Sequence, residues 1–530
     1  MYYKKLTGLV LAAVLSFGYI GSAQAAFGDG LQNNMHVLWE QSSYNPHLKD
    51  IIVADDASIV KIAGGKIRGS MQNGIYQYLG VPYAEAKERF VKAESVKPWK
   101  GVKDTTKYGP ISPQYLFGTA TPITDVPTSN SNQNLNIWTA SLNKNAKKPV
   151  MVWLHGGGYV SGSGNEAWYN GENLAKKGDV VVVTVNHRLN VLGYLDLSAY
   201  GDKYKDSANI GSTDMLAALR WINKNIDKFG GDPNNVTIFG ESGGGSKVLE
   251  LMSIPSAKGL FHKGIVESGV AMPTNGKFIP SAISQEVTAK TLEILNITPD
   301  KIEELQTLPL EQLWQASDKA LKIVAEKYKI PSPLGNGYGM QLRPVCGTDF
   351  LPTDFIHNDK FVESGKDIPL LLGTNLNEFT TIFPGILHKE MSELQKQLYA
   401  QTYPDKDPAS AAYVDTAFRL SALEVLKYKA RQNAPVYSYL FTKGTGQAGA
   451  YHTSEIPFVF SNAQEDEQLQ DTMTALWSSF AHTGIPSAVN VPEWKPYTEA
   501  NGYTMLLDDE SELVQHHDKV LMQALIANSN

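Results

Sequence analysis

The sequence predicts a doubly wound α/β fold with a mostly parallel central sheet, and three kinds of segment support that prediction. Residues 149–154 and 180–185 are apolar at nearly every position, which is typical of strands buried on both faces of a parallel sheet. Residues 214–229 carry apolar side chains three or four apart, the spacing of an amphipathic helix. Residues 236–251 have the pattern of a strand, a sharp turn and a helix in succession.

The other elements are predicted by the same kind of pattern. Residues 56–83 alternate between apolar and polar and suggest antiparallel strands, with a hairpin turn at Gly64 and Gly65. Residues 102–134 are rich in Pro, Ser, Thr and Asn and are expected to form a long surface loop. Further strands are expected at residues 136–138, 261–268, 368–372 and 435–441, and helices within 275–345, within 385–432, around 469–480 and from 511 onward. Because no Pro/Gly/Ser-rich linker interrupts this alternation, residues 26–530 are predicted to form a single domain.

Residues 1–25 are expected to be a cleaved signal peptide. Lys4 and Lys5 make the start basic, residues 6–20 form an apolar core, and residues 23–25 offer a small-x-small cleavage site. A single membrane anchor is the alternative, but the apolar core is short for a membrane span. The protein is therefore predicted to be secreted or periplasmic, with no stable membrane anchor after cleavage.

Composition narrows the possible partners and compartment. The chain is 42% hydrophobic and 19% charged, as in an ordinary soluble globular protein. Its net charge of -7 and the absence of a basic patch argue against a nucleic-acid partner. Cys346 is the single cysteine, so no internal disulfide can form, and export without disulfides favours a bacterial periplasm or medium. Cys346 is interpreted as a small buried hydrophobic side chain rather than a reactive thiol.

Ser242 is the predicted nucleophile. Gly240 and Glu241 precede it, and Gly243 and Gly244 follow it, between an apolar strand pattern and a helical pattern. A G-x-S-x-G turn in this setting is a nucleophile elbow, in which small residues let the helix pack close under the strand. The turn exposes the hydroxyl over the end of the sheet, at a helix N-terminus whose partial positive charge favours developing negative charge.

The general base and the acid that orients it are expected downstream, because enzymes with this elbow use the chain order Ser, acid, His. His452 follows a predicted strand by a short Gly-rich loop, which can bring its imidazole over the sheet edge, whereas His482 and His516 are placed on helices. Glu378 lies just past a predicted strand, between the elbow and His452. Spacing alone leaves Glu378 and Asp349 as alternative acids. Activity is expected to rise as His452 loses its proton, at about pH 6 to 7 unless its surroundings shift it.

A run of three glycines supplies the predicted oxyanion hole. Gly156, Gly157 and Gly158 follow a buried strand and present backbone N–H groups that no side chain covers. The amides of Gly157, Gly158 and Gly243 are the expected donors. A phosphate-binding loop is disfavoured because no Lys-Ser or Lys-Thr pair follows the glycines, and His155 is interpreted as structural. This chemistry needs neither a metal nor a nucleotide cofactor.

With these parts in place, the chain resembles the type B carboxylesterase family, the branch of α/β-hydrolases that includes bacterial para-nitrobenzyl-type esterases and the cholinesterases. The resembling stretches span nearly the whole mature chain in the family's order: YLGVPYAEAKERF (78–90), LNIW (135–138), VWLHGGGYVSGS (152–163), VNHRLNVLGYL (185–195), ANIGSTDMLAALRWINKNIDKFGGDPNNVTIFGESGGGS (208–246), LLGTNLNEFTTIF (371–383) and GAYHTSEIPFVF (449–460).

The resemblance implies the α/β-hydrolase fold and cleavage of carboxylic esters through an acyl-enzyme. The family's Ser-Glu-His triad falls on Ser242, Glu378 and His452, which selects Glu378 over Asp349. The family's oxyanion donors fall on Gly157, Gly158 and Gly243.

The chain departs from the family pattern in several places. Gly243 replaces the usual alanine, which keeps the amide but is expected to loosen the elbow. Phe379 replaces the usual glycine after the acid and is expected to place an aromatic ring near the pocket. The N-terminal disulfide common in the family is missing here, and Ser112 and Asn132 stand near the positions of its two cysteines. Residues 112–132 contain no tryptophan, the residue on which cholinesterases bind choline by a cation–π contact, so a choline ester is disfavoured.

The predicted function is therefore that of an exported serine carboxylic-ester hydrolase with a small-molecule ester as its substrate. The alternatives are a specialised lipase, a carbamate or polyester hydrolase of the same fold, and a catalytically silent cholinesterase-like binding protein. The natural ester, the acyl-chain preference and the oligomeric state are open at this level.

Overall fold

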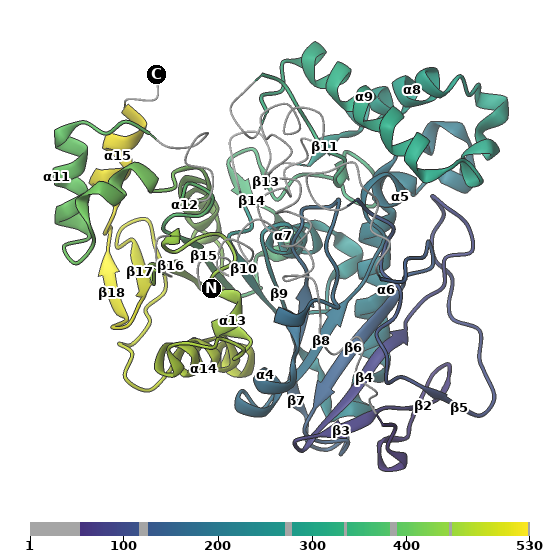
Figure 1. Ribbon diagram of the computed structural model, residues 1–530, viewed down its shortest axis with the longest axis horizontal. Helices are drawn as coiled ribbons and strands as arrows, with labels where there is room; N and C mark the ends of the chain where they lie inside the picture. Colours follow the sequence, from purple (N-terminus) through teal and green to yellow (C-terminus); the bar gives the residue numbers. More distant parts are fainter. Residues whose placement is uncertain are drawn as a thin grey trace, which may run out of the picture.

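An eleven-stranded sheet runs through the molecule in the computed structural model, which describes residues 53–115, 126–270, 278–332, 337–381, 389–444 and 448–527 (Figure 1). In spatial order its strands are β18 (Glu512–Gln515), β17 (Tyr503–Leu507), β16 (Val436–Phe441), β15 (Leu370–Asn375), β10 (Lys263–Glu267), β9 (Gly231–Glu241), β7 (Lys148–Leu154), β8 (Val181–Val185), β6 (Asn134–Thr139), β4 (Ile75–Pro82) and β3 (Ser70–Gln72). The strands from β17 to β8 are parallel, and antiparallel strands flank them at both edges. The predicted α/β fold class is confirmed.

Helices cover both faces of the sheet. Their bounds are α4 (Glu172–Lys177), α5 (Asn190–Tyr194), α6 (Ile210–Asn225), α7 (Gly243–Ser253), α8 (Ser281–Leu295), α9 (Leu310–Tyr328), α11 (Glu393–Thr402), α12 (Ala417–Lys429), α13 (Ile456–Val459), α14 (Glu467–Thr483) and α15 (Lys519–Ala527). Alternate residues of β7 enter different cores: Val152 packs in one with α6, α7 and α12, and Trp153 packs in another with α4 and α14. Because each strand faces two hydrophobic cores, apolar side chains predominate on both faces of the central strands.

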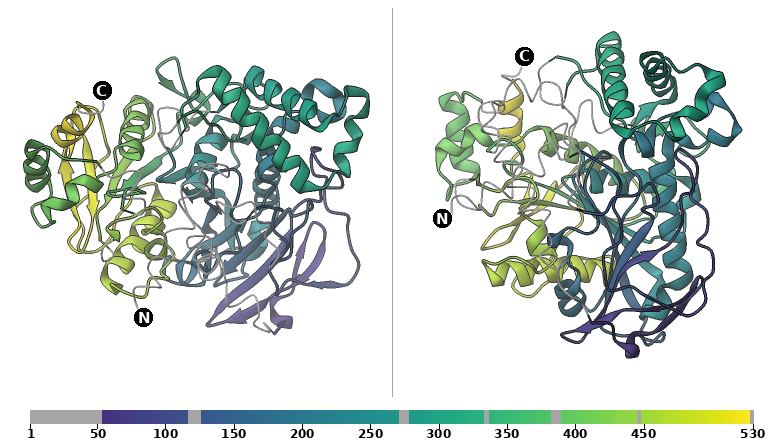
Figure 2. Two further views of the ribbon diagram at one scale, coloured as in Figure 1. Left: turned by 45° about the horizontal axis from the view of Figure 1, so that its top comes forward. Right: turned by 45° about the vertical axis from the view of Figure 1, so that its right-hand side comes forward.

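Short strands and a helical layer complete the described part of the fold. The short strands are β1 (Val60–Ile62), β2 (Gly65–Arg68), β5 (Val102–Asp104), β11 (Ile279–Pro280), β12 (Val345–Cys346), β13 (Ile356–His357) and β14 (Lys360–Phe361). The β1–β2 pair forms the predicted hairpin, with Ile62 opposite Gly65. Helices α8 and α9 lie beside each other above α5, at one end of the molecule (Figures 1 and 2), and share a third hydrophobic core with it.

Two sequence predictions about secondary structure are wrong in part. The C-terminal helix does not begin at residue 511, because residues 512–515 pair with β17 as an antiparallel edge strand and α15 begins at Lys519. Residues 102–134 are not simply a surface loop, because Gln114 and Asn132 are buried. Asn132 donates to the carbonyl of His187, and Gln114 exchanges hydrogen bonds with the backbone of Gly162, so both polar side chains satisfy buried backbone groups. The predicted signal peptide, residues 1–25, lies outside the described residues.

Candidate active site

Ser242 occupies a strained turn between the end of β9 and the start of α7. Its φ is 54° and its ψ is -124°, a conformation that non-glycine residues rarely adopt. The backbone N–H of Ser242 donates to the carbonyl of Glu267 at 2.8 Å, which ties the turn to β10. A Cβ atom at Gly244 would stand 1.9 Å from the carbonyl oxygen of Leu154, so the helix start approaches β7 more closely than any side chain allows. The local geometry is that of a strained strand-to-helix elbow.

Glu378 and His452 meet beyond the carboxyl ends of two neighbouring parallel strands. Glu378 follows β15, and His452 follows β16. The N–H of His452 donates to the carbonyl of Glu378 at 3.0 Å, and Nδ1 of the imidazole lies 2.5 Å from Oε2 of the carboxylate. Both side chains are fully buried. Asp349, the other acid considered, is exposed.

The second carboxylate oxygen of Glu378 is held by two donors. Ser268 donates its hydroxyl to Oε1 at 2.7 Å, and the backbone N–H of Asn375 donates to the same oxygen at 2.8 Å. Ser268 lies just past β10, and Asn375 ends β15. These contacts orient the carboxylate so that its remaining oxygen faces His452.

Burial dominates the protonation of this pair. Burial lowers the pKa of His452 to about 4, against the opposing effect of the carboxylates of Glu455 and Asp415. Burial raises the pKa of Glu378, and the hydrogen bonds that Asn375 and Ser268 donate to its carboxylate oppose that rise. The shift of His452 is downward because a charged imidazolium loses its hydration in the interior. The onset of activity expected from the sequence at about pH 6 to 7 therefore moves to lower pH.

The other imidazole nitrogen faces the elbow. Nε2 of His452 lies 3.0 Å from Oε1 of Glu241, the residue before Ser242. Neither atom has a hydrogen-bond partner among the described residues. Burial, together with the nearby Glu455 and Glu378, raises the pKa of Glu241 well above its usual value. Glu241 is thus held toward its neutral form, beside the imidazole nitrogen that does not contact Glu378.

The three-glycine loop lies directly against the start of α7. Gly157 and Gly158 have φ values of +83° and +61°, in the left-handed region that favours glycine. A Cβ atom at Gly243 would stand 2.4 Å from the backbone N, Cα and O of Gly158. The expectation that Gly243 loosens the elbow is therefore wrong, because in this chain glycine permits a contact that alanine would block. His155, before the loop, is buried and bonds the carbonyl of Gly156, in keeping with a structural role.

Two phenyl rings pack against the imidazole. The ring centroids of Phe379 and Phe418 lie 4.1 and 5.1 Å from that of His452, and both rings are inclined to it at 48°. Phe379 is the aromatic residue that the sequence placed near the pocket, whereas Phe418, on the first turn of α12, was not identified. These rings account for part of the burial that lowers the pKa of His452.

Several polar residues of the site escaped the sequence-level reasoning. Glu241 sits inside the elbow motif itself, and Ser268 is the last residue of the strand expected at 261–268, one residue past the end of β10. Its place at a strand end was the available signal, since the carboxyl ends of parallel strands meet at one edge of the sheet. Lys247, a buried residue of α7 that donates to the carbonyl of His155, offered no such signal, because a lysine in an amphipathic helix pattern is normally solvated.

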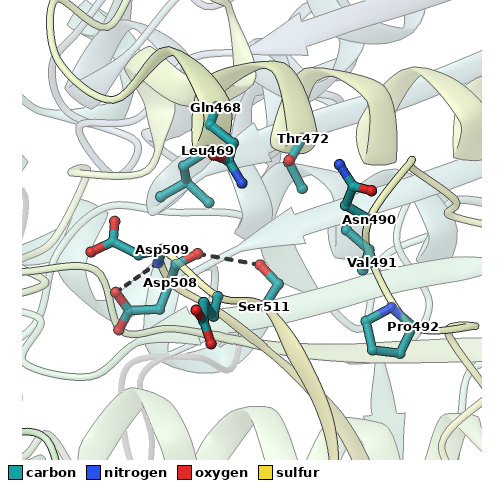
Figure 3. A pocket seen from close by; sticks show the side chains of 10 residues that line it. Gln468, Leu469, Thr472, Asn490, Val491, Pro492, Asp508, Asp509 and Ser511 are labelled. Atoms are coloured by element: carbon teal, nitrogen blue, oxygen red, sulfur yellow. Dashed lines mark hydrogen bonds between the residues drawn. The ribbon is translucent and has the colours of Figure 1, made fainter.

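A separate surface cavity of about 420 Å³ lies between α14 and the turn that joins β17 to β18 (Figure 3). Asp508 and Asp509 line it, together with Leu469 and Pro492. Asp508 accepts hydrogen bonds from Lys406 and Thr442, and Asp509 pairs with Lys443. Its lining includes neither Ser242 nor His452, so this cavity is distinct from the site at the elbow.

Comparisons with known proteins identify the family of the chain. A family model described as the carboxylesterase family matches residues 56–410 and 401–524. The chain is 33% identical over 490 residues to the para-nitrobenzyl esterase of Bacillus subtilis (strain 168), with 85% of this chain and 95% of that protein covered. It is 29% identical over 498 residues to the phenmedipham hydrolase of Pseudarthrobacter oxydans, with 85% of this chain and 95% of that protein covered.

Solved structures give the same picture. An esterase from anaerobic Clostridium hathewayi, described as able to hydrolyse aliphatic aromatic polyesters, matches with a TM-score of 0.78 and 35% identity, over 90% of this chain and 99% of that one. A thermophilic para-nitrobenzyl esterase matches with a TM-score of 0.73 and 30% identity, over 88% of this chain and 99% of that one. In the part of the chain that the structure describes, no helix is both long and apolar enough to span a membrane.

Proposed function

The chain belongs to the carboxylesterase family, with the α/β-hydrolase fold, and from that premise we propose that it is an exported serine esterase that works through an acyl-enzyme on Ser242. The carboxylesterase activity follows from the family. The assignment of the individual catalytic groups is the proposal. The observation that supports it most directly is the buried contact between Nδ1 of His452 and Oε2 of Glu378, with Nε2 turned toward the elbow.

In the first half-reaction, Nε2 of His452 takes the proton of the Ser242 hydroxyl as its oxygen attacks the ester carbonyl. Glu378 accepts a hydrogen bond from Nδ1–H, which fixes the tautomer and stabilises the imidazolium that forms. The amides of Gly157, Gly158 and Gly243 donate to the oxyanion, a contribution of ~3 kcal/mol or more for each donor in comparable enzymes. His452 then protonates the leaving alcohol, and the acyl group remains on the serine.

In the second half-reaction, His452 deprotonates a water molecule that attacks the acyl-enzyme. The acid is released and the serine recovers its proton. Because burial lowers its pKa, the imidazole of His452 is neutral at neutral pH, which is the form that can accept the serine proton.

Hydrolysis of p-nitrophenyl butyrate by wild type and by Ser242→Ala at equal fold content tests the proposal. We expect turnover by the wild type and a loss of ~10⁴-fold or more in kcat for the variant. Labelling of intact wild type by a fluorophosphonate, with the adduct located by mass spectrometry, should place the modification on Ser242. Equal activity of the two proteins, or an adduct on another residue, would refute the assignment. Inactivity of both would favour the alternative of a silent binding protein.

Export is the second part of the proposal and rests on residues 1–25. Expression of the full chain in a Gram-negative host should yield a periplasmic or extracellular protein whose intact mass corresponds to cleavage near Ala25. The same chain without residues 2–25 should remain in the cytoplasm. Recovery of the full-length chain, uncleaved, in the membrane fraction would instead support the membrane-anchor alternative.

Polyester hydrolysis is a second candidate activity. It is favoured by the similarity to the Clostridium hathewayi esterase, which is described as hydrolysing aliphatic aromatic polyesters. Release of soluble acids from an aliphatic-aromatic polyester film by wild type, and not by Ser242→Ala, would support it. Activity confined to soluble short-chain esters would restrict the enzyme to small-molecule substrates.

A further inference from the structure

Lys247 is a fully buried lysine close to the proposed nucleophile. It lies on α7, five residues after Ser242, and its side chain has no exposure to solvent. Lysine is almost never fully buried, because its ammonium group loses hydration in the interior unless specific partners compensate. Burial lowers the pKa of Lys247 to about 7, with the carboxylates of Glu250 and Glu166 opposing the shift. Because burying the ammonium group costs its hydration free energy, Lys247 is expected to make structural contacts that offset this cost.

The contacts of Lys247 reach both ends of the three-glycine loop. Its Nζ donates to the carbonyl of His155, the residue before Gly156, at 2.7 Å. The same Nζ lies 5.6 Å from the ring centroid of Tyr159, the residue after Gly158. His155 itself is fixed by stacking on His187, with 5.0 Å between ring centroids and 20° between planes. Lys247 therefore joins the helix that carries the nucleophile to the flanks of the loop opposite it.

The three-glycine loop itself contributes few contacts that would hold it against α7. Its three glycines have no side chains to pack. Gly157 and Gly158 have positive φ values, and glycine adopts positive and negative φ with similar ease, so these angles do not hold the loop in place. The carbonyl of Gly157 accepts from the N–H groups of Val160 and Ser161 and from the Ser161 hydroxyl, and the carbonyl of Gly156 bonds Nδ1 of His155. These bonds close the turn but do not tie it to α7. Lys247 supplies an attachment between the loop and the helix where Gly158 approaches Gly243.

We propose that Lys247 is a positioning residue of the oxyanion hole, which tethers the three-glycine loop to the nucleophile helix through the carbonyl of His155. This inference rests on the proposed function. The tether keeps the amides of Gly157 and Gly158 in register with the Ser242 hydroxyl, so that the donors are already aimed when the oxyanion forms. A neutral lysine amine still carries N–H donors, so the hydrogen bond persists if the charge is lost.

The test compares Lys247→Met with Lys429→Met. Lys429 is an equally buried lysine on α12 that donates to the carbonyl of Gly365 at 2.9 Å and lies 5.6 Å from the ring centroid of Phe361. It therefore matches Lys247 in burial, in its carbonyl partner and in its aromatic neighbour, without contacting the loop. The readouts are kcat and KM for p-nitrophenyl butyrate, and the inhibition constant of an alkyl trifluoromethyl ketone, which forms a tetrahedral serine adduct.

For Lys247→Met we expect kcat to fall ~10- to 100-fold with KM changed less than threefold, because misaligned donors weaken the transition state more than the ground state. The affinity for the trifluoromethyl ketone should fall by a similar factor. Lys429→Met should keep the wild-type values of all three quantities per folded molecule. Lys247→Arg, which retains a charged donor, should recover part of the lost kcat.

Wild-type kcat in folded Lys247→Met would overturn the inference, and so would equal losses in both methionine variants, which would indicate a general cost of removing a buried ammonium. If Lys247→Met does not fold, Lys247→Gln decides, because its shorter, uncharged side chain cannot keep the 2.7 Å contact with the His155 carbonyl. Reduced kcat and reduced ketone affinity in folded Lys247→Gln support the tether, whereas wild-type values of both, or failure of both variants to fold, overturn it. The proposed function is judged separately. If Ser242→Ala retains activity, the catalytic assignment itself is wrong, whatever Lys247→Met does.

Discussion

Nδ1 of His452 lies 2.5 Å from Oε2 of Glu378, although the two residues are 74 positions apart in the sequence. They meet because β15 and β16 are parallel neighbours whose carboxyl ends lie at one edge of the sheet. Each residue stands in the loop after its strand, and neither side chain is accessible to solvent. The pairing can therefore be probed by changing the acid, the pH or the apolar surroundings of the imidazole.

Glu378→Gln should lower kcat for p-nitrophenyl butyrate ~10³- to 10⁴-fold with little change in KM. A neutral amide cannot stabilise the imidazolium and can favour the wrong imidazole tautomer. Asp349→Asn removes the exposed carboxylate that the sequence offered as an alternative, and it should keep wild-type kcat. Loss of activity in Asp349→Asn but not in Glu378→Gln would reverse the assignment.

The pH dependence of kcat/KM should reflect the buried state of His452. The base is active when neutral, so activity is lost as pH falls through the pKa of the free enzyme. Since burial lowers the pKa of His452 to about 4, activity should be level near pH 7 and decline only well below the ordinary histidine value of about 6.5. The profile is measured only where circular dichroism shows a folded protein. An acid limb at or above about pH 6.5 would contradict the prediction.

Phe379→Gly should move that acid limb to higher pH. The phenyl ring lies 4.1 Å from the imidazole, centroid to centroid, and its removal lets water reach the ring and stabilise the imidazolium. Phe379→Leu keeps the site apolar and should leave the limb nearly unchanged. The comparison uses kcat/KM profiles of the two folded variants, and identical profiles would show that Phe379 does not set the pKa of His452.

Gly243→Ala should lower kcat ~10-fold or more, even though alanine is the usual family residue. The added methyl group would stand 2.4 Å from the backbone of Gly158, so the loop or the elbow must move. Gly444→Ala is the control, because among the described residues the nearest atom to its added carbon, the Cα of Gly449, is 3.8 Å away, and it should retain wild-type kcat. Unchanged kcat in Gly243→Ala would show that the loop yields without cost to catalysis.

Asp518→Asn should lower the free energy of unfolding by ~3–5 kcal/mol, because it leaves the buried guanidinium of Arg419 without its countercharge. The two side chains are joined at 2.6 and 3.1 Å and link α12 to the residue before α15. Burial alone would raise the pKa of Asp518, but Arg419 outweighs it and the pKa ends below its usual value. The stabilisation is therefore present above the unfolded-state pKa and is lost as pH falls through the folded-state value.

Urea unfolding at pH 7 measures this effect. Glu499→Gln, which breaks the exposed pair between Glu499 and Arg431, is the control and should have little effect on the free energy of unfolding. Equal losses of unfolding free energy in Asp518→Asn and Glu499→Gln would show that breaking the buried ion pair costs no more stability than breaking the exposed one.

The nucleophile turn could be predicted from the sequence because the residues that form it are neighbours in the chain. Ser242 was found from the glycines around it and from the strand and helix patterns on either side. The C-terminal segment shows the opposite case, since Leu513 and Val514 fit an amphipathic helix pattern as well as a strand. Pairing with β17 makes residues 512–515 a strand, and that partner lies outside any local window.

Contacts between distant residues escaped prediction for the same reason. Ser268 lies 110 residues from Glu378, and Lys247 lies 92 residues from His155. Nothing in the neighbourhood of either residue in the sequence shows which group it meets. Sheet order brings these pairs together, and sheet order is a property of the whole chain.

The sequence by itself determined the fold class, the order of the central strands along the chain, the elbow at Ser242 and the glycine loop, because periodicity and turn chemistry are encoded within a few residues. Position after a predicted strand pointed to His452, and the family pattern selected Glu378 over Asp349. Only the tertiary structure decided that His452 is buried against Phe379 and Phe418, that Gly243 is tightly packed rather than loose, and that Lys247 reaches the loop. Burial, close approach and hydrogen-bond partners depend on distances across parallel strands and between helix and sheet, which the chain acquires only when it is folded.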